Sequence, residues 1–251
     1  MKPYEAFAWI YDEVMSHIDY PAWVAFALNV LRDHGLPSPG SGEVRILECG
    51  AGTGTAAIIL ALEGYRVHAF DSSPSMIEVA GFKTRGMKNS PDLRVMDFLE
   101  LNSVGSYHAV LCLFDSVNYL VEPAQVVDFF RRVRDALAPE GLFLFDVCTE
   151  INSILYFDDR CETRSGEGFD FRRRMRYFSD AGIQENLITI RFDGHPDELL
   201  IERHHQRIYP IEVMRAYAGA AGLTILEEMH EFERRPPEID ALRVHFLCTV
   251  E

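Results

Sequence analysis

Near residue 50 of this 251-residue chain, a turn rich in glycine joins one apolar segment to the next. Gly50, Gly52 and Gly54 allow the backbone to turn tightly and allow a ligand to approach main-chain N–H groups at the start of a helix. The turn therefore predicts a strand, a ligand-binding loop and a helix, in that order. A tight strand-to-helix connection that binds no ligand is the alternative that these glycines alone leave open.

Strand and helix patterns alternate from residue 44 to residue 148. Parallel strands need crossover helices between them, so the alternation predicts a doubly wound, mostly parallel α/β sheet. A stretch of helical periodicity at residues 4–36 precedes this region. The expected strands are 44–47, 65–71, 93–98, 108–114 and 142–148, and the expected helices are 55–63, a segment that begins at Pro74, and 126–137.

The pattern changes after residue 150, where strands follow one another without helices between them. Consecutive strands can pair antiparallel through short turns, so this region predicts an inserted antiparallel sheet. A helix at 211–221 and strands at 223–229 and 242–250 follow, and the short link between those two strands predicts that they are antiparallel neighbours. The strands expected in the insertion are 169–178, 187–192 and 199–209.

These patterns predict a chain of three parts. Residues 1–35 form an N-terminal helical cap, residues 36–150 and 209–251 form the core, and residues 151–208 form an antiparallel lid beside the site.

Charge and composition exclude several classes of protein. Thirty-nine acidic and 24 basic residues give a net charge of −15, and so acidic a surface repels nucleic-acid backbones. The dense basic run of Arg172, Arg173, Arg174 and Arg176 is interpreted as a solvated strand face, with a phosphate site as the alternative. No apolar run reaches the roughly 18 residues of a membrane span, and the N-terminus does not look like a signal peptide, so we expect a cytoplasmic protein. Five cysteines without CxxC spacing predict reduced thiols rather than disulfides or metal ligands.

Carboxylates stand at the ends of the first three expected strands. Glu48 precedes the glycine turn, where its carboxylate would repel a pyrophosphate and attract an ammonium group. Thr55 stands where the dinucleotide-binding pattern GxGxxG needs a glycine or alanine. Both features argue against a nicotinamide-dependent oxidoreductase. Asp71 is placed to accept hydrogen bonds from ribose hydroxyls, or to cap the next helix. Asp97 and Phe98 are placed to bind adenine, or to form a turn beside the core.

Two segments carry a resemblance to a known family. Residues 46–54 (ILECGAGTG) and 69–73 (AFDSS) resemble motifs I and II of class I S-adenosylmethionine-dependent methyltransferases, and residues 137–147 resemble the strand-five motif. The resemblance implies a seven-stranded Rossmann-like sheet with an antiparallel last strand, S-adenosylmethionine as cofactor, and methyl transfer as the activity. The cofactor-binding residues it implies are Glu48, Gly50, Ala51, Gly52, Gly54, Asp71, Ser72, Met76, Asp97, Phe98, Phe114 and Tyr11.

The loop after the fourth strand indicates the kind of acceptor. Asp115, Asn118 and Tyr119 stand where the family places the acceptor, and the run resembles a poorly characterised bacterial group of small-molecule enzymes. The Asn/Asp-Pro-Pro-aromatic motif of amino-methylating nucleic-acid enzymes and the Pro-Cys of cytosine enzymes are both missing. We therefore expect a methyl group to be transferred to nitrogen or oxygen of a small molecule. An RNA or protein methyltransferase and a non-catalytic binding regulator remain the alternatives.

Adjacent histidines in the insertion are the last candidates. His204 and His205 on one strand face opposite sides, so they do not share a metal ion, and no metal site is expected. One of them is placed to act as a general base in the cleft, and we assign that catalytic role to His205, with Asp115, Asn118 and Tyr119. A solvent-facing histidine pair on a lid is the alternative.

Overall fold

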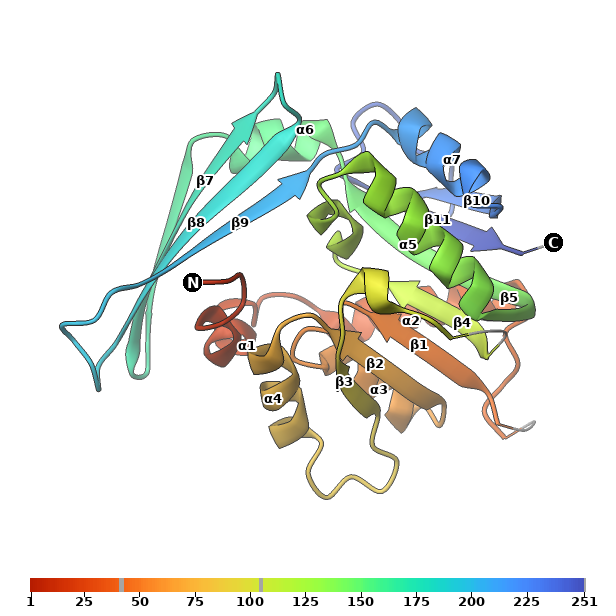
Figure 1. The fold of residues 1–251 in the computed structure, drawn as a ribbon, viewed down its shortest axis with the longest axis horizontal. Helices are drawn as coiled ribbons and strands as arrows, with labels where there is room; N and C mark the ends of the chain where they lie inside the picture. The colour runs from red at the N-terminus through yellow and green to blue at the C-terminus, as the bar shows by residue number, and fades with distance from the viewer. Residues whose placement is uncertain (41–42, 104–105, 251) are drawn as a thin grey trace.

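A central sheet of seven strands forms the core of the computed structural model, which describes residues 1–40, 43–103 and 106–250 (Figure 1). The strand order is β10-β11-β5-β4-β1-β2-β3, and β11 alone runs antiparallel to its two neighbours. The strands of this sheet are β1 (Arg45–Cys49), β2 (Arg66–Asp71), β3 (Asp92–Val95), β4 (Tyr107–Cys112), β5 (Leu137–Cys148), β10 (Thr224–His230) and β11 (Arg243–Thr249).

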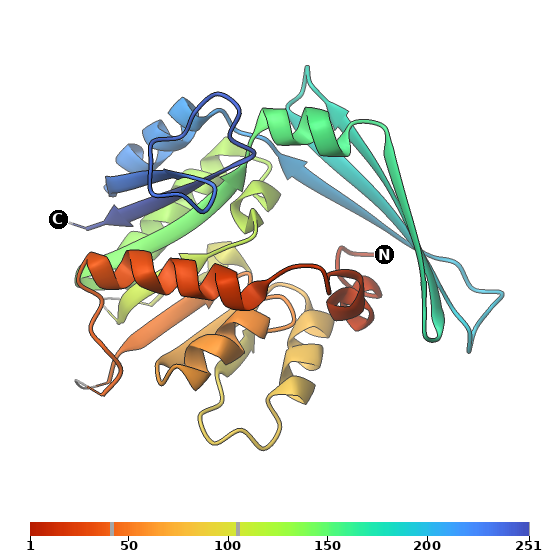
Figure 2. The same ribbon diagram turned by 180° about the vertical axis from the view of Figure 1, so that it is seen from behind.

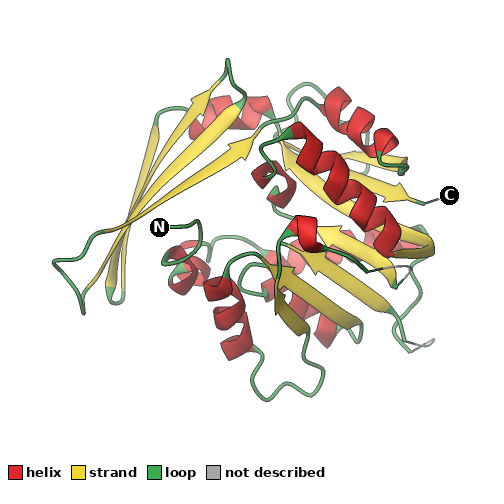
Figure 3. Ribbon diagram, viewed as in Figure 1, coloured by secondary structure: helices red, strands yellow, loops and turns green. Residues whose placement is uncertain are grey.

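Helices cover both faces of the sheet, as Figure 3 shows. The apolar faces of α5 and α7 pack on one side, and those of α2 and α3 pack on the other. Residues 126, 129, 130 and 133 recur at helical spacing in α5 and are all buried, which explains why this segment forms a core-facing helix. The longer helices are α2 (Tyr20–Asp33), α3 (Thr55–Leu62), α4 (Pro74–Lys83), α5 (Pro123–Ala136) and α7 (Ile211–Ala220).

Short helical turns connect these elements, mainly near the carboxyl ends of the strands. They are η1 (Phe7–Trp9), α1 (Tyr11–Val14), η2 (Phe98–Glu100), η3 (Ser116–Tyr119), α6 (Glu150–Asn152) and the π-helical turn η4 (Ser153–Phe157). The N-terminal helical stretch is therefore not continuous. It ends after α1 and resumes at α2, where Asp19 caps the helix by accepting the Ala22 N–H at 3.0 Å.

A second, antiparallel sheet projects from the core beside the N-terminal segment, in both views of the ribbon (Figures 1 and 2). Apolar side chains of η1 and α1 pack on its inner face against β7 and β8. Its strands, in spatial order, are β6 (Arg160–Gly166), β7 (Phe169–Phe178), β8 (Ile183–Phe192) and β9 (Leu200–Arg207).

The fold class expected from sequence is confirmed, with local differences; one is that β8 begins four residues before the expected start, at Ile183. The strand β6 was not expected, because its residues are mostly polar and it is held by cross-strand pairs such as Glu162 with Arg173. The strand β3 ends at Val95 rather than at residue 98, because Asp97 caps η2. The strand β5 begins five residues early, at Leu137, where it pairs with Tyr107. Residues 41–42, 104–105 and 251 of the expected core lie outside the described residues.

Gly54 fixes the packing of α3 against α4. It has a φ of +74°, and a Cβ atom there would lie 2.9 Å from the Cβ of Ala80. Gly81, in α4, has no heavy atom within 4 Å of an added Cβ.

We predict opposite effects of alanine at these two glycines. Gly54→Ala should lower the free energy of unfolding by about 1–3 kcal/mol, because it strains the backbone and crowds Ala80. Gly81→Ala should raise it by about 0.5–1 kcal/mol, because alanine favours a helix. Urea denaturation measures both, and equal effects would contradict this account.

Candidate functional site

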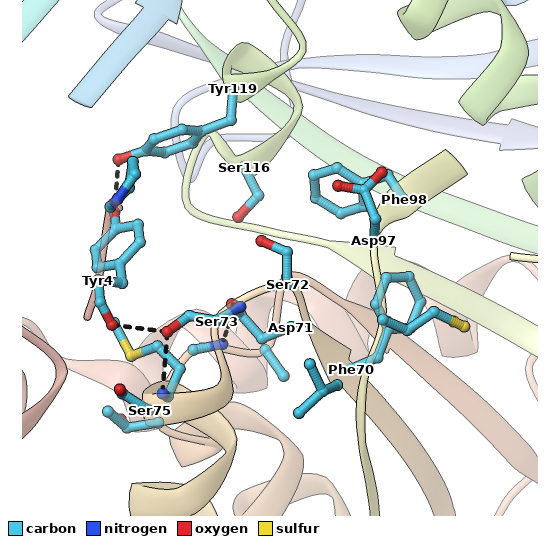
Figure 4. A pocket seen from close by; sticks show the side chains of 18 of the residues that line it. Tyr4, Phe70, Asp71, Ser72, Ser73, Ser75, Asp97, Phe98, Ser116 and Tyr119 are labelled. Atoms are coloured by element: carbon cyan, nitrogen blue, oxygen red, sulfur yellow. Dashed lines mark hydrogen bonds between the residues drawn. The ribbon is translucent and has the colours of Figure 1, made fainter. Parts of the chain in front are cut away.

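A cavity of about 820 Å³ lies at the carboxyl ends of the parallel strands (Figure 4). Open α/β sheets place their ligand crevices at this edge. The turn after β1, the end of β2, the β3–η2 link and the β4–η3 loop line one part of the cavity. Residues 2–5, Tyr11 and Tyr20 add the N-terminal part of the lining.

The glycine turn approaches its neighbours closely. The N–H groups of Gly50 and Ala51 both donate to the Phe70 carbonyl oxygen at 2.9 Å. Gly50 has a φ of +73°, and an added Cβ would lie 2.9 Å from Ser116 Oγ. A larger residue at position 50 would therefore strain the turn and close part of the cavity wall.

Asp71 joins the ends of the first two strands. Its Oδ2 accepts the Gly52 N–H at 2.9 Å, and its Oδ1 accepts the Ser73 N–H at 2.8 Å. Burial raises the pKa of this carboxyl, and the two hydrogen bonds oppose that rise. Each carboxylate oxygen has a further lone pair, so Asp71 also has capacity for donors from a ligand in the cavity.

Glu48 is buried at the cavity wall with one oxygen unsatisfied. Its exposed fraction is 4%, and its Oε2 has no hydrogen-bond partner among the described residues. Burial, with a smaller contribution from the charge of Asp71, raises the pKa of Glu48 to about 8. A buried, unpartnered carboxyl of this kind is a site for a cationic ligand group.

Aromatic hydroxyls line the N-terminal end of the cavity. The hydroxyls of Tyr4 and Tyr119 are 2.6 Å apart, and both residues line the cavity (Figure 4). Tyr119 also contacts Nδ1 of His204 at 3.2 Å, and Nε2 of His204 lies 2.9 Å from Glu202 Oε2. A hydrogen-bonded chain thus runs from the cavity into the second sheet.

The structure brings together most of the residues that the motifs single out for a cofactor. Eleven of the twelve line the cavity: Tyr11, Glu48, Gly50, Ala51, Gly52, Asp71, Ser72, Met76, Asp97, Phe98 and Phe114. Gly54 does not line it, because its Cα faces Ala80 of α4. Their roles toward a cofactor remain predictions.

Two predicted acceptor-site residues instead hold the framework together. Asp115 pairs with Arg243 at 2.6 Å and accepts from Gln206 at 2.5 Å, and Arg243 also pairs with Asp146. Asn118 is fully buried; it donates to the Arg207 carbonyl at 2.6 Å and accepts the Cys148 N–H at 3.3 Å. Neither lines the cavity, whereas Tyr119 does.

The assignment of His205 to the cleft disagrees with its place in the structure. Its side chain is 46% exposed and contacts Glu185 at 3.1 Å on the outer face of β9. His204 is 2% exposed and faces inward. Adjacent residues of a strand face opposite sides, and the sequence alone does not show which side faces the cavity.

Several lining residues were not singled out by sequence. Tyr4, Thr53, Ser73, Met96 and Ser116 all line the cavity. Thr53 and Ser73 lie within the two motif segments, 46–54 and 69–73, so their position was a usable signal. Tyr4 is brought to the cavity by a left-handed backbone turn with a φ of +59°, which no sequence pattern indicates.

The described residues contain neither a candidate metal site nor a candidate membrane-spanning helix. No group of three or more His, Cys, Asp or Glu side chains there is arranged to hold a metal ion. No helix in the described part of the chain has the length and apolar character needed to cross a membrane.

Comparisons with known proteins agree with this geometry. A family model described as "Methyltransferase domain" matches residues 46–141. The protein named "Putative methyltransferase GWCH70_2453" of Geobacillus sp. (strain WCH70) is 31% identical over 98% of both chains. The protein named "Putative methyltransferase YqeM" of Bacillus subtilis (strain 168) is 28% identical over 97% of this chain and 95% of its own.

Solved structures share the fold. An S-adenosylmethionine-dependent methyltransferase from Clostridium acetobutylicum ATCC 824 superposes with a TM-score of 0.83 at 21% identity, covering 98% of both chains. The sugar N-methyltransferase KedS8 from Streptoalloteichus sp ATCC 53650 gives a TM-score of 0.74 at 18% identity, covering 95% of this chain and 91% of its own. CalS10 from Micromonospora echinaspora is an amino pentose methyltransferase solved with S-adenosylmethionine bound. It gives a TM-score of 0.67 at 17% identity, covering 93% of this chain and 92% of its own.

Four observations lead to one conclusion: the glycine turn, the acidic residues at the strand ends, the strand order with one reversed strand, and the relatives that match over nearly the whole chain. The chain belongs to the class I family of S-adenosylmethionine-dependent methyltransferases.

Proposed function

We propose that this methyltransferase transfers the methyl group of S-adenosylmethionine to nitrogen or oxygen of a small molecule. The observation that carries the proposal is the covered cavity, in which the N-terminal segment contributes residues 2–5 to the wall and hydrogen-bonds to β9. A cavity of about 820 Å³ is of the size that takes a cofactor with a small second molecule rather than a polymer. The net charge of −15 also disfavours RNA as a substrate.

The division of the chain supports the same proposal. Residues 1–35 act as a cap, residues 151–208 act as a lid, and residues 36–150 with 209–251 form the core that holds the cofactor. Solved enzymes of the same fold include a sugar N-methyltransferase and an amino pentose methyltransferase, so an acceptor amine on a small polar molecule is the first class to test.

The residues at the cavity suit S-adenosylmethionine. The unpartnered Oε2 of Glu48 suits the ammonium group of its methionine part, and the free lone pairs of Asp71 suit the ribose hydroxyls. Asp97 and Phe98 are assigned to the adenine. When bound, the cofactor supplies a methyl group that its sulfonium already activates. The protein then has to align the acceptor and exclude water.

Cofactor binding should be coupled to deprotonation of Glu48. The pKa of about 8 leaves this carboxyl mostly protonated at pH 7 in the free protein, and a neighbouring ammonium lowers that pKa. Binding should therefore release a proton and tighten as the pH rises from 6 to 7.5, where the ligand amine is still largely charged. Calorimetry in two buffers of different ionisation enthalpy measures this release. Glu48→Gln should abolish it and weaken binding about tenfold at pH 7.5.

The stability of the free protein provides the control. The folded pKa of Glu48 lies above its unfolded value, so this group makes folding less favourable as the pH rises from about 4.5 to 8. Glu48→Gln should raise the melting temperature at pH 8 and change it little at pH 4.5. A lower melting temperature at pH 8 would show that Glu48 has a structural partner and would remove its assignment to the ligand.

Asp71 should contribute more to cofactor affinity than Asp97. Losing charge-assisted hydrogen bonds of about 1.5–3 kcal/mol implies that Asp71→Ala binds S-adenosylmethionine roughly ten- to a hundredfold more weakly. Asp97→Ala should have a smaller effect, because Phe98 still contacts the adenine. Titration calorimetry gives both dissociation constants, and circular dichroism shows whether each variant is folded. An unchanged constant for folded Asp71→Ala would mean that Asp71 only holds Gly52 and Ser73.

A transfer assay tests the acceptor class directly. The purified protein is incubated with S-adenosylmethionine labelled in its methyl group and with separate pools of amino sugars, other amines, hydroxyl-bearing metabolites, transfer RNA and bulk protein. We expect label in a small-molecule pool, and mass spectrometry of the product then distinguishes N- from O-methylation. Label in RNA or protein alone, or cofactor binding with no transfer to any pool, would overturn the proposal.

A further inference from the structure

We propose that Glu202, His204, Tyr119 and Tyr4 form a proton relay that accepts the proton released by the methyl acceptor. The inference rests on the proposed function and adds to it a group that receives the proton and a requirement on the acceptor. It assigns a role to two residues, Glu202 and Tyr4, that no sequence motif indicates.

The relay is continuous and well shielded from water. Tyr4 and Tyr119 are 2.6 Å apart at their hydroxyls, Tyr119 and His204 Nδ1 are 3.2 Å apart, and His204 Nε2 and Glu202 Oε2 are 2.9 Å apart. Glu202 and His204 are 1% and 2% exposed. Only the two tyrosines line the cavity, so the chain has one end at the acceptor space and the other inside the protein.

Both oxygens of Glu202 accept main-chain N–H groups, which favours the ionised carboxylate and sets the direction of every bond. Burial alone would raise the pKa of Glu202, but hydrogen bonds from His204 and from the N–H groups of Phe7 and Ala6 lower it below its ordinary value. An ionised carboxylate only accepts hydrogen bonds, so Nε2 of His204 carries the proton. In the neutral imidazole of His204, Nδ1 then carries no proton and accepts a hydrogen bond.

The two tyrosines must follow the same direction. Because Nδ1 of His204 is an acceptor, the Tyr119 hydroxyl donates to it, and the Tyr119 oxygen accepts the proton of Tyr4. The Tyr4 oxygen is left with a free lone pair toward the cavity. An N–H or O–H group is the partner that this lone pair requires, so the relay selects acceptors that carry a removable proton.

The proton balance follows from this direction. The acceptor lone pair forms the new bond to the methyl carbon, and the electron pair of the broken carbon–sulfur bond stays on sulfur. The proton of the acceptor passes to the Tyr4 oxygen, the Tyr4 proton passes to Tyr119, and the Tyr119 proton passes to Nδ1 of His204. The resulting imidazolium is stabilised by the Glu202 carboxylate, and its proton returns through Tyr119 and Tyr4 to water in the cavity after the product leaves.

The tyrosines act as neutral carriers. Burial holds the pKa of both Tyr4 and Tyr119 above the ordinary tyrosine value, so neither is an ionised base at neutral pH. The charged side chains that influence this region include Glu202 on β9, Asp71 at the end of β2, Arg173 on β7 with its partner Glu162, and Asp115 with its partner Arg243. Asp115 and Arg173 act on Tyr119 in opposite directions, and each is already paired.

The direction of the relay can be measured without an acceptor. Full-length protein labelled with 15N-histidine should show His204 protonated at Nε2 and bare at Nδ1 in a long-range 1H–15N spectrum. Tyr119→Phe should shift the Nδ1 signal, because it removes the donor, and the exposed His205→Gln should leave it unchanged. A proton on Nδ1 of His204, or an Nδ1 signal that Tyr119→Phe does not move, would overturn the relay.

Kinetics then separate a relay from a structural role. With the acceptor that the transfer assay identifies, Tyr4→Phe and Tyr119→Phe should lower kcat at least tenfold, while the dissociation constant for S-adenosylmethionine stays within threefold. His204→Gln should lower kcat about a hundredfold and change the dependence of kcat on pH. The matched His205→Gln variant should keep both the rate and the pH profile.

The outcomes distinguish the two proposals. Transfer to a small molecule with an unchanged pH profile in His204→Gln would reject the relay and leave the proposed function intact. Transfer only to RNA or protein would reject the proposed function, and the spectrum of His204 would still decide whether the relay has the stated direction.

Discussion

The covered shape of the site depends on the buried carboxylate of Glu202. This side chain lies on β9 of the second sheet, and it accepts the main-chain N–H groups of Tyr4, Ala6 and Phe7 at 2.8, 2.6 and 2.9 Å, together with His204. A carboxylate removed from water needs such donors to replace its lost solvation. One acceptor therefore fixes the N-terminal segment against the second sheet and keeps Tyr4 at the cavity.

Much of the core, and the part of the cavity lining that lies around the glycine turn, was predictable from sequence, because the signals are local. The glycine turn, and the acidic residues Glu48 and Asp71 at strand ends, can be read within a few residues of each strand. Parallel strands then bring their carboxyl ends to one edge without further information, so Glu48, Asp71 and Phe98 meet at one cavity.

The remaining site was not predictable because its contacts are distant in sequence. Asp115 looks like an acceptor-site residue until Arg243, 128 residues later, pairs with it. The strand pattern around His204 and His205 indicates two faces but not which one β9 turns toward the cavity. The strand β6 has the same limitation, since its polar residues form a strand only when Arg173 of β7 faces Glu162. Contacts between different elements, which no pattern within one segment shows, decide all three cases.

The buried carboxylates near the cavity differ in how their charge is compensated, and the difference separates framework from binding site. Glu202 has four donors, and Asp115 shares the cation of Arg243 with Asp146. Glu48 and Asp146 each keep one oxygen without a donor among the described residues, but of these four carboxylates only Glu48 lies at the cavity wall. An unsatisfied buried oxygen of this kind lowers stability, and a cationic ligand group is the partner we propose for it. Glu48, beside the glycine turn, is therefore the group to which we assign the cationic part of the cofactor, whereas Asp115 and Glu202 are assigned to the framework.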